Sequence, residues 1–340
     1  MNNSYLWDRS GARDPEVERL EHLLGPLRRE HLANDLPVER LVRPRSSARS
    51  WRWYFAPFAL AASIALLVAG TWWNTRSSLD VWNFEPMSGT PTVGAIPLLA
   101  LQGARLDQWL ETDASSTARL SASDVGEVEI GPASRVRLAT ARRGEHRLEL
   151  LRGSLHAYVW AKPGQFFVDT PSATAIDLGC AYTLNVDSSG DGRLHVTAGW
   201  VGLEHDRRIS FVPAGGTCVL KRGRGPGTPH LDDVPSAMAG GLATLDSSVA
   251  ADATAAALDV VLAEARPGDA FTLWHLLSRP DRRQAERVYD RLAQLAPPPA
   301  SVRRDLVLAG DRVALDAWWD SLGLGEAALF RTWKLRPASR

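Results

Sequence analysis

A short acidic stretch, DSSGDG at residues 187–192, has the residue types of a calcium-binding loop. Such a loop needs spaced carboxylate oxygens and a bidentate glutamate at its twelfth position. Ala198 occupies that position, and alternating apolar runs precede and follow the stretch. The sequence therefore predicts a hairpin turn here and not a calcium site.

Other signatures of catalysis and phosphate binding are incomplete. The glycine-rich KRGRGPG at 221–227 lacks the Gly-Lys-Ser/Thr ending of a phosphate-binding loop, and the chain contains no Gly-x-Ser-x-Gly nucleophile elbow. Four histidines lie in or beside predicted strands without a repeated partner spacing: His146, His156, His195 and His205. We expect no catalytic residue, no metal site and no cofactor. A hydrolase stays open as a minor alternative, because sequence spacing does not report the distance between carboxylates.

The chain has two cysteines, Cys180 and Cys218. Neither has an adjacent histidine that would mark a nucleophile, and no Cys-x-x-Cys or His-x-x-x-His spacing suggests zinc. In an oxidising compartment the two thiols can pair, and closing a loop of about 38 residues would stabilise the fold by roughly 4 kcal/mol. Two unrelated buried thiols are the alternative, and both interpretations stay open at this point.

Composition sets broad limits on the partners of the chain. Its 340 residues are 23% charged and 45% hydrophobic, an ordinary globular balance that allows two domains beside an anchor. The formal net charge of +0 provides no field that would attract nucleic acid. We therefore expect no direct contact with DNA or RNA.

The stretch FAPFALAASIALLVAGTWW, residues 55–73, carries no charge over 19 positions. As a helix it would reach about 30 Å, the thickness of the hydrocarbon core of a bilayer. Some fifty polar residues precede it, which argues against a cleaved secretion signal, and a buried helix of a soluble core is the remaining alternative. The sequence predicts a transmembrane helix over 53–75. The tryptophans expected at its membrane interfaces are Trp51, Trp53, Trp72 and Trp73.

The charges that flank this segment predict its orientation. Five arginines precede it without an acidic residue after Glu39: Arg40, Arg43, Arg45, Arg49 and Arg52. On the other side, Arg76 is followed by Asp80 and Glu85. The positive-inside bias therefore places the N-terminus in the cytoplasm and the bulk of the chain in the periplasm or outside the cell, with a single pass through the cell (inner) membrane.

The predicted cytoplasmic tail, residues 1–52, contains one amphipathic helix that begins near Asp14 and Pro15. Its apolar stripe consists of Val17, Leu20, Leu24 and Leu27. A lone helix has no core to face, so we expect the stripe to bind another protein or the membrane surface. Fraying in solution is the alternative, because short isolated helices are marginal in water.

Beyond the membrane segment, residues 76–107 have the proline and glycine content of an extended linker. Residues 108–222 then change to period two, with short runs such as RVRLAT, QFFVDT, CAYTLNV and WVGLEH. Glycines recur beside these runs at intervals of 22, 26, 20 and 16: Gly131, Gly153, Gly179, Gly199 and Gly215. We predict a mainly β domain, a rolled or solenoid-like antiparallel sheet built of stacked hairpins.

The last third of the chain changes again. Residues 223–245 include GRGPGTP and are expected to form a second linker. Residues 246–340 contain four segments with helical spacing and Asp or Ser starts, which predict an all-α module. Leu258 with Leu262 and Val288 with Leu292 provide the apolar i, i+4 pairs of helix hairpins.

Five blocks of the β region resemble, in order, the exterior domain of the FecR family of single-pass envelope proteins. They are GPASRVRL from Gly131, LELLRGSLHAYV from Leu148, FFVDTPSATAIDLGCAYTLNV from Phe166, LHVTAGWVGLE from Leu194 and VPAGGTCVL from Val212. Cys180 replaces the usual threonine of one block, and Cys218 lies in the last. The resemblance thus favours a disulfide between neighbouring strands.

The resemblance implies a signalling regulator whose exterior domain senses an envelope protein and whose cytoplasmic tail controls a sigma factor. The first fifty residues match the family's sigma-binding part only loosely, and they contain no cysteine for a zinc motif. The expected partners are a sigma factor, an envelope protein and the lipid bilayer. The alternative is a cell-envelope scaffold that binds a protein or a glycan without any sigma factor.

Overall fold

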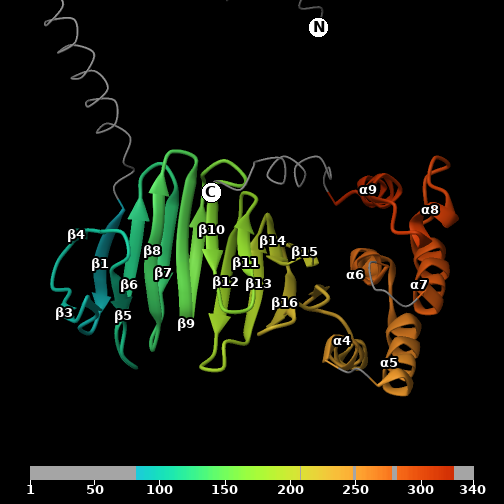
Figure 1. Ribbon diagram of the computed structural model, residues 1–340, viewed down its shortest axis with the longest axis horizontal. Coiled ribbons are helices and arrows are strands. Elements are labelled where there is room, and N and C mark those ends of the chain that lie inside the picture. The colour runs from blue at the N-terminus through green and yellow to red at the C-terminus, as the bar shows by residue number, and fades with distance from the viewer. Residues whose placement is uncertain (1–81, 207, 248–249, 278–281, 325–340) are drawn as a thin grey trace, which may run out of the picture. The chain divides into compact units, whose positions relative to one another are not determined.

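The computed structural model describes residues 82–206, 208–247, 250–277 and 282–324 (Figure 1), all within one compact unit that spans residues 66–340. The predicted tail and membrane segment lie outside the described residues. So do the site candidates placed on them: Val17, Leu20, Leu24, Leu27, Trp51, Trp53, Trp72 and Trp73. Among the helices that the structure describes, none has both the length and the apolar character needed to cross a membrane.

The described strands form two sheets that share the long strand β9 (Glu145–Val159). Sheet A contains, in spatial order, β4 (Gln102–Gly103), β1 (Asn83–Ser88), β6 (Thr117–Ala122), β7 (Gly126–Ile130), β9, β12 (Ala181–Val186), β13 (Gly192–Ala198) and β16 (Gly216–Lys221). The short strands β17 (Gly225–Pro226) and β18 (His230–Leu231) both pair with β16.

Sheet B contains, in spatial order, β3 (Ile96–Pro97), β2 (Thr92–Val93), β5 (Trp109–Glu111), β8 (Arg135–Arg142), β9, β10 (Phe166–Asp169), β11 (Thr174–Asp177), β14 (Trp200–His205) and β15 (Arg208–Pro213). Among the described pairings, only that of β9 with β10 is parallel. The strand runs read from the sequence coincide with β8 to β15, so the mainly β prediction is confirmed.

The chain alternates between the two sheets as it advances (Figure 1). The recurrent glycines lie at the crossings: Gly131 between β7 and β8, Gly153 within β9, Gly179 between β11 and β12, Gly199 between β13 and β14, and Gly215 between β15 and β16. At Gly153 φ is +96°, a left-handed conformation that L side chains avoid, and an added Cβ would overlap Ser134. The recurrent glycines therefore mark the points where the chain passes from one sheet to the other.

The core of the β domain lies between the two sheets. Alternate residues of each strand point inward, as in β8, where Val136 and Leu138 are buried and Arg135 and Arg137 are half-buried. Side chains from both sheets form one apolar cluster that includes Phe84, Leu120, Leu148, Phe166, Leu184 and Leu203. Burial of each large side chain stabilises the fold by about 2 kcal/mol, which fixes which face of each strand looks outward.

The C-terminal helices form a second apolar core. They are α4 (Ser236–Ser247), α5 (Ala251–Glu264), a 3₁₀ turn (Pro267–Asp269), α6 (Ala270–Leu276), α7 (Arg282–Leu295), α8 (Arg304–Leu308) and α9 (Arg312–Ser321). The predicted pairs contribute to this core: Leu258, Val288 and Leu292 are buried, and Leu262 packs against them. Asp311 caps α9 by accepting a 2.8 Å hydrogen bond from the backbone N–H of Ala314.

Both predicted linkers are wrong within the described residues. The range 76–107 contains β1 to β4, and β1 pairs with β6 over most of its length. The range 223–245 contains β17, β18 and most of α4, with β17 and β18 adding to sheet A. Apart from β1, the strands in these ranges are only two residues long, so their pairing depends on neighbouring strands and leaves no period-two signal in the sequence.

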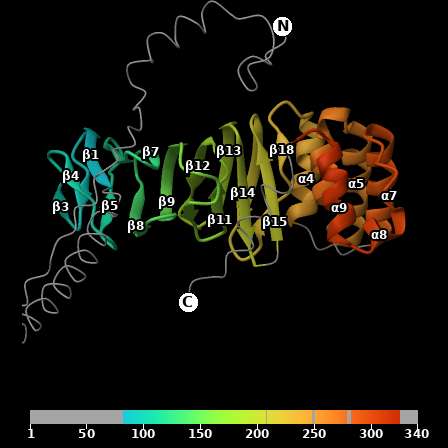
Figure 2. The same cartoon turned by 90° about the horizontal axis from the view of Figure 1, so that it is seen from above.

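The helical module packs on one end of sheet B (Figure 2). Phe271 of α6 and Trp319 of α9 form an apolar cluster with Trp200 of β14 and Phe211 of β15. Strands β5, β8, β9 and β10 contribute no residue to this cluster. The outward-facing residues of these four strands are therefore the candidate binding surface.

Candidate functional site

The outward side of β5, β8, β9 and β10, which we call the recognition face, carries arginines stacked on aromatic rings. The guanidinium carbons of Arg135 and Arg137 lie 4.5 Å and 4.9 Å from the centroid of the Trp109 ring. Arg147 lies 4.6 Å from the centroid of Phe167. Each such cation–π contact contributes about 0.5–1 kcal/mol at an exposed site and holds both side chains in place. The face is therefore an ordered array of aromatic and cationic groups.

Carboxylates on the recognition face pair with its arginines. Arg137 Nε donates to Glu149 Oε2 at 2.6 Å, across the pairing of β8 with β9. Arg147 Nη1 donates to Asp169 Oδ1 at 2.7 Å, and the Thr174 hydroxyl donates to the same oxygen at 2.7 Å. The paired carboxylates are thus held as hydrogen-bond acceptors. The side chains of these two pairs are 27–32% exposed, so water screens the pairs and they contribute little to stability.

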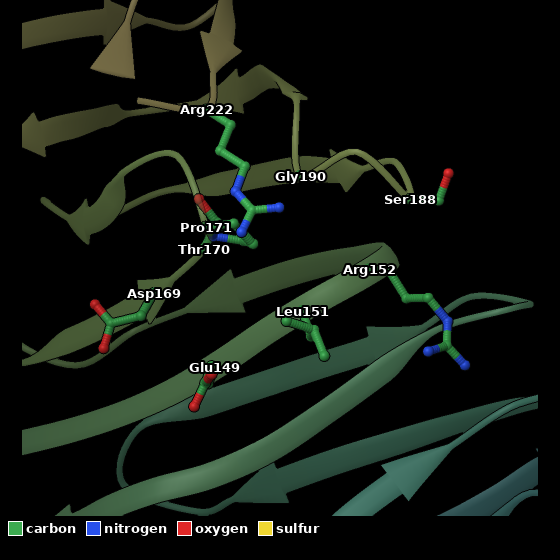
Figure 3. A pocket seen from close by; sticks show the side chains of 9 residues that line it. All are labelled: Glu149, Leu151, Arg152, Asp169, Thr170, Pro171, Ser188, Gly190 and Arg222. Atoms are coloured by element: carbon green, nitrogen blue, oxygen red, sulfur yellow. The ribbon is translucent and has the colours of Figure 1, made fainter. Parts of the chain in front are cut away.

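A pocket of about 510 Å³ adjoins the recognition face where β9 reaches its bend and β10 ends. Glu149, Leu151 and Arg152 line it from β9 (Figure 3). The end of β10 contributes Asp169, and the turn after it contributes Thr170 and Pro171. The hairpin turn after β12 and the residue that follows β16 contribute the remaining lining residues: Ser188, Gly190 and Arg222. Four separate segments therefore build this pocket.

The hairpin turn that lines the pocket is the DSSGDG stretch, as predicted. Asp187 Oδ1 accepts hydrogen bonds from the backbone N–H groups of Ser189 at 2.8 Å and Asp191 at 3.1 Å. The hydroxyl and backbone N–H of Ser189 hold the pKa of Asp187 below its usual value. Among the described residues no group of three or more His, Cys, Asp or Glu side chains is placed to hold a metal ion.

Cationic and hydroxyl groups fix the far wall of the pocket. Asp191 accepts from Lys221 Nζ at 2.7 Å and from the backbone N–H of Arg222 at 2.9 Å, and these bonds lower its pKa. Ser172 donates to the carbonyl of Gly190. In Figure 3 the Arg222 side chain lies beside Pro171. The wall is ordered before any ligand arrives, which lowers the entropy cost of binding.

The arrangement offers groups that can bind a ligand. The pocket presents the guanidinium groups of Arg152 and Arg222 and the carboxylates of Glu149 and Asp169, with no cysteine, histidine or lysine among the residues that line it. Hydrogen bonds, ion pairs and contacts with aromatic rings are the interactions available here. They suit the recognition of a polar peptide or protein surface.

The predicted disulfide between Cys180 and Cys218 is wrong, because both residues are free and buried. Cys180 immediately precedes β12, and Cys218 lies in β16, opposite Leu194 of β13. Strand β13 therefore lies between the two cysteines, and the register offsets them by several residues along the strand direction. Their Cα atoms are thus about 15 Å apart. Two Cα atoms more than about 7 Å apart cannot be bridged.

Each thiol has its own buried environment. Cys180 Sγ donates to Asp177 Oδ1, and Cys218 Sγ lies 3.5 Å from the carbonyl oxygen of Gly227. Burial raises the pKa of both thiols above their usual range, and the Asp177 carboxylate adds to the effect at Cys180. Burial also raises the pKa of Asp177 to about 6. The thiols are therefore protonated and unreactive, which agrees with the alternative that they are two unrelated buried thiols.

The sequence did not predict the recognition face. A signal was present in the arginines and aromatic residues at the outward positions of period-two strands, Arg135 and Arg137 in β8 and Phe167 in β10. Their cation–π partners and paired carboxylates lie on neighbouring strands. These contacts depend on the register in which neighbouring strands pair, and the sequence alone did not predict that register.

Comparison with known proteins gives a family match for the β domain. Residues 108–202 match the family model described as FecR protein. Two crystal structures of a candidate anti-sigma factor from Parabacteroides distasonis, at 1.65 Å and 2.50 Å resolution, share 14% sequence identity with this chain at a TM-score of 0.33. The similarity covers 40% of this chain and 64% of theirs. The search of curated proteins found no match.

The family match extends from the strand that carries Trp109 to the one that carries Gly202. It includes the whole recognition face and four of the five sheet-crossing glycines. The resemblance predicted from the sequence blocks is confirmed for this part of the chain. Residues 108–202 therefore resemble a FecR domain.

Proposed function

We propose that this chain is a regulator of the FecR type, anchored in the cell (inner) membrane by residues 53–75. Its N-terminal tail lies in the cytoplasm, and its β domain lies on the opposite side of the membrane. The match of residues 108–202 to the FecR family supports the proposal. So does the uncharged segment at residues 55–73 with arginines on one side.

On this proposal the recognition face binds an envelope protein. Tryptophan and arginine are the side chains most enriched at the centres of protein interfaces, and the face presents Trp109 between two arginines. Each arginine stacked on a ring is held in place before binding, so less entropy is lost on association. The chain needs no catalytic group for this role, and we propose that it is not an enzyme.

The cytoplasmic tail controls a sigma factor through the apolar stripe that includes Leu20 and Leu24. Binding of the envelope partner outside then changes the assembly or cleavage of the chain, and a coupling of about 1–3 kcal/mol is enough to switch the inner partner.

The test uses the full-length chain isolated from cells in a mild detergent, with sigma factors identified by mass spectrometry. The wild type is expected to retain a sigma factor. Leu20→Asp with Leu24→Asp is expected to lose it, because a charge on the apolar stripe opposes docking. His22→Asp introduces the same side chain on the opposite side of the predicted helix and is the matched control.

Recovery of no sigma factor with the wild type would favour the envelope scaffold. A reporter gene tests the outer half separately. Trp109→Ala and Arg147→Ala are expected to abolish induced transcription while the tail still retains its sigma factor. Induction that survives both substitutions would remove the recognition face from the proposal.

A further inference from the structure

The loop and hairpin before β5 expose an unusual amount of apolar surface. Residues 94–106 read GAIPLLALQGARL and contain a single charged residue, Arg105. Four large side chains in this range are mostly exposed: Ile96 at 71%, Leu99 at 80%, Leu101 at 62% and Leu106 at 52%. We call these four residues the apolar rim. Scattered apolar residues are normal on a surface, but four within eleven positions are typical of a contact site.

The apolar rim is displayed by a fixed backbone. Leu98, at the centre of the range, is 1% exposed, and its backbone N–H donates to the carbonyl of Pro91 at 2.7 Å. The hairpin of β2 and β3 joins sheet B through the pairing of Val93 with Leu110. The backbone that carries the rim side chains is therefore held by hydrogen bonds to the rest of the β domain.

The rim also adjoins the point where the described chain begins. The backbone N–H of Ala104 donates to the carbonyl of Trp82 at 2.7 Å, and Asn83 pairs with Gly103. Leu101 and Leu106 lie within three residues of Ala104 along the chain. The surface of this loop is thus next to the residue that connects to the apolar segment at 55–73.

Only eight residues, 74–81, separate Trp73 from Trp82. Fully extended, that length of chain spans at most about 30 Å. If the apolar segment lies in a bilayer, as in the proposed function on which this inference rests, the first strand must stay near the membrane surface. The parts of the β domain closest to Trp82 are then closest to the lipid.

We propose that the apolar rim inserts into the lipid headgroup region and holds the β domain against the membrane. Aliphatic side chains favour the boundary between headgroups and acyl chains, and Arg105 is placed to contact anionic lipid. A second copy of the chain is the competing occupant. The short tether favours lipid, and β3 is only two residues long, too short to pair firmly with another edge strand.

The test uses the full-length chain in vesicles of phosphatidylethanolamine and phosphatidylglycerol. A single cysteine at Leu99→Cys carries an environment-sensitive fluorophore. Val313→Cys on α9 is the matched control, because Val313 is also apolar and 74% exposed. The unsubstituted chain measures background labelling, since Cys180 and Cys218 are buried. Lipids with a spin label near the headgroup report contact by quenching the fluorophore.

The Leu99 probe is expected to show blue-shifted emission and to lose about half of it or more to the spin-labelled lipid, as for a side chain inserted roughly 5–10 Å. The Val313 probe is expected to show neither effect. In a Leu106→Cys probe, the added substitutions Leu99→Asp and Leu101→Asp are expected to remove the quenching. These positions are exposed, so the melting temperature should stay unchanged.

Flotation of the unsubstituted chain with the vesicles separates the two proposals. A chain that floats while its Leu99 probe is unshifted and unquenched would overturn the apolar-rim inference and leave the proposed function intact. A blue shift without quenching by lipid would assign the rim to a protein contact and would also overturn the inference. A chain that does not float would overturn the proposed anchoring, and the inference with it.

Discussion

The Nε2 atom of His275 in α6 accepts a 2.9 Å hydrogen bond from the backbone N–H of Phe211 in β15. Because Nε2 accepts, the ring proton is on Nδ1, which donates to the carbonyl of Phe271 at 2.7 Å. The rings of Trp274 and Trp319 pack edge-on against the imidazole, at centroid distances of 5.2 Å and 5.7 Å. A neutral histidine thus ties the helical module to the β domain.

Protonation of His275 is expected to weaken this connection. Burial lowers the pKa of His275 from 6.5 to about 4. The unfolded chain therefore binds a proton between these values while the folded chain does not, so the stability that neutral His275 contributes is full above pH 6.5 and falls as the pH drops toward 4. The shift corresponds to about 3 kcal/mol. Urea unfolding between pH 4 and 7, followed by far-UV circular dichroism, measures it.

His275→Gln is the control for this titration, because a glutamine oxygen can accept the same hydrogen bond and does not titrate. The difference in stability between wild type and variant is expected to shrink or reverse in sign as the pH falls from 6.5 to 4. A difference that is constant with pH would contradict the assignment.

Asp177 is expected to act in the opposite direction. Burial raises its pKa from 3.8 to about 6, and the hydrogen bonds from Cys180 and Gly179 only partly oppose that shift. The folded chain holds the proton longer than the unfolded chain, so this stability is present below pH 3.8 and is lost as the pH rises through 6. The loss is about 3 kcal/mol.

Asp177→Asn removes this titration while keeping an acceptor for the backbone N–H of Gly179. The variant is expected to be more stable than the wild type at pH 7, and the two should converge toward pH 4 in thermal melts. A variant that is less stable at pH 7 by the same amount as at pH 4 would show that Asp177 is not strained when ionised.

The fold is expected to be sensitive to any side chain added at Gly153 in β9. Gly153→Ala is expected to destabilise the fold by at least about 2 kcal/mol, because a left-handed alanine is strained and its Cβ would overlap Ser134. Gly179→Ala is the matched control, since Gly179 has φ +89° and no atom within 4 Å of an added Cβ. Its expected cost is only about 1–2 kcal/mol. Equal losses in urea unfolding would contradict the steric part of the explanation.

The sequence predicted the part of the fold that has a clear period. Strands β8 to β15 follow the alternation of apolar residues, as in Val136 and Leu138, because one face of each strand is buried. The five recurrent glycines proved to mark the crossings between sheets. Helix α9 was predicted from its Asp311 start, which forms the expected cap.

The sequence did not predict the elements whose structure depends on contacts with distant parts of the chain. Helix α4 contains Gly240 and Gly241, which argue against a helix, yet an added Cβ at Gly241 would lie only 2.8 Å from Val261 of α5. Close approach of the two helices explains that glycine. The disulfide prediction was wrong because it assumed that β12 and β16 are neighbours, and β13 lies between them.

The free thiols allow a direct check of that correction. Cys180 and Cys218 are buried and protonated, so a thiol reagent is expected to modify neither in the native protein purified without reductant, and both after unfolding in guanidinium. Rapid modification in the native state would contradict their burial. Absence of modification even after unfolding would restore the disulfide.

Labelling of intact cells tests whether the two ends of the chain lie on opposite sides of the inner membrane. Cysteines added singly by Ser4→Cys or Val313→Cys are treated with a membrane-impermeant maleimide after the outer membrane is made permeable, and the unsubstituted chain, with Cys180 and Cys218 alone, provides the background. With the proposed topology, only the Val313→Cys protein is expected to be labelled, and Ser4→Cys is expected to react after the inner membrane is lysed. Labelling of both positions, or of neither, in intact cells would place the two ends of the chain in one compartment and overturn the proposed single-pass topology.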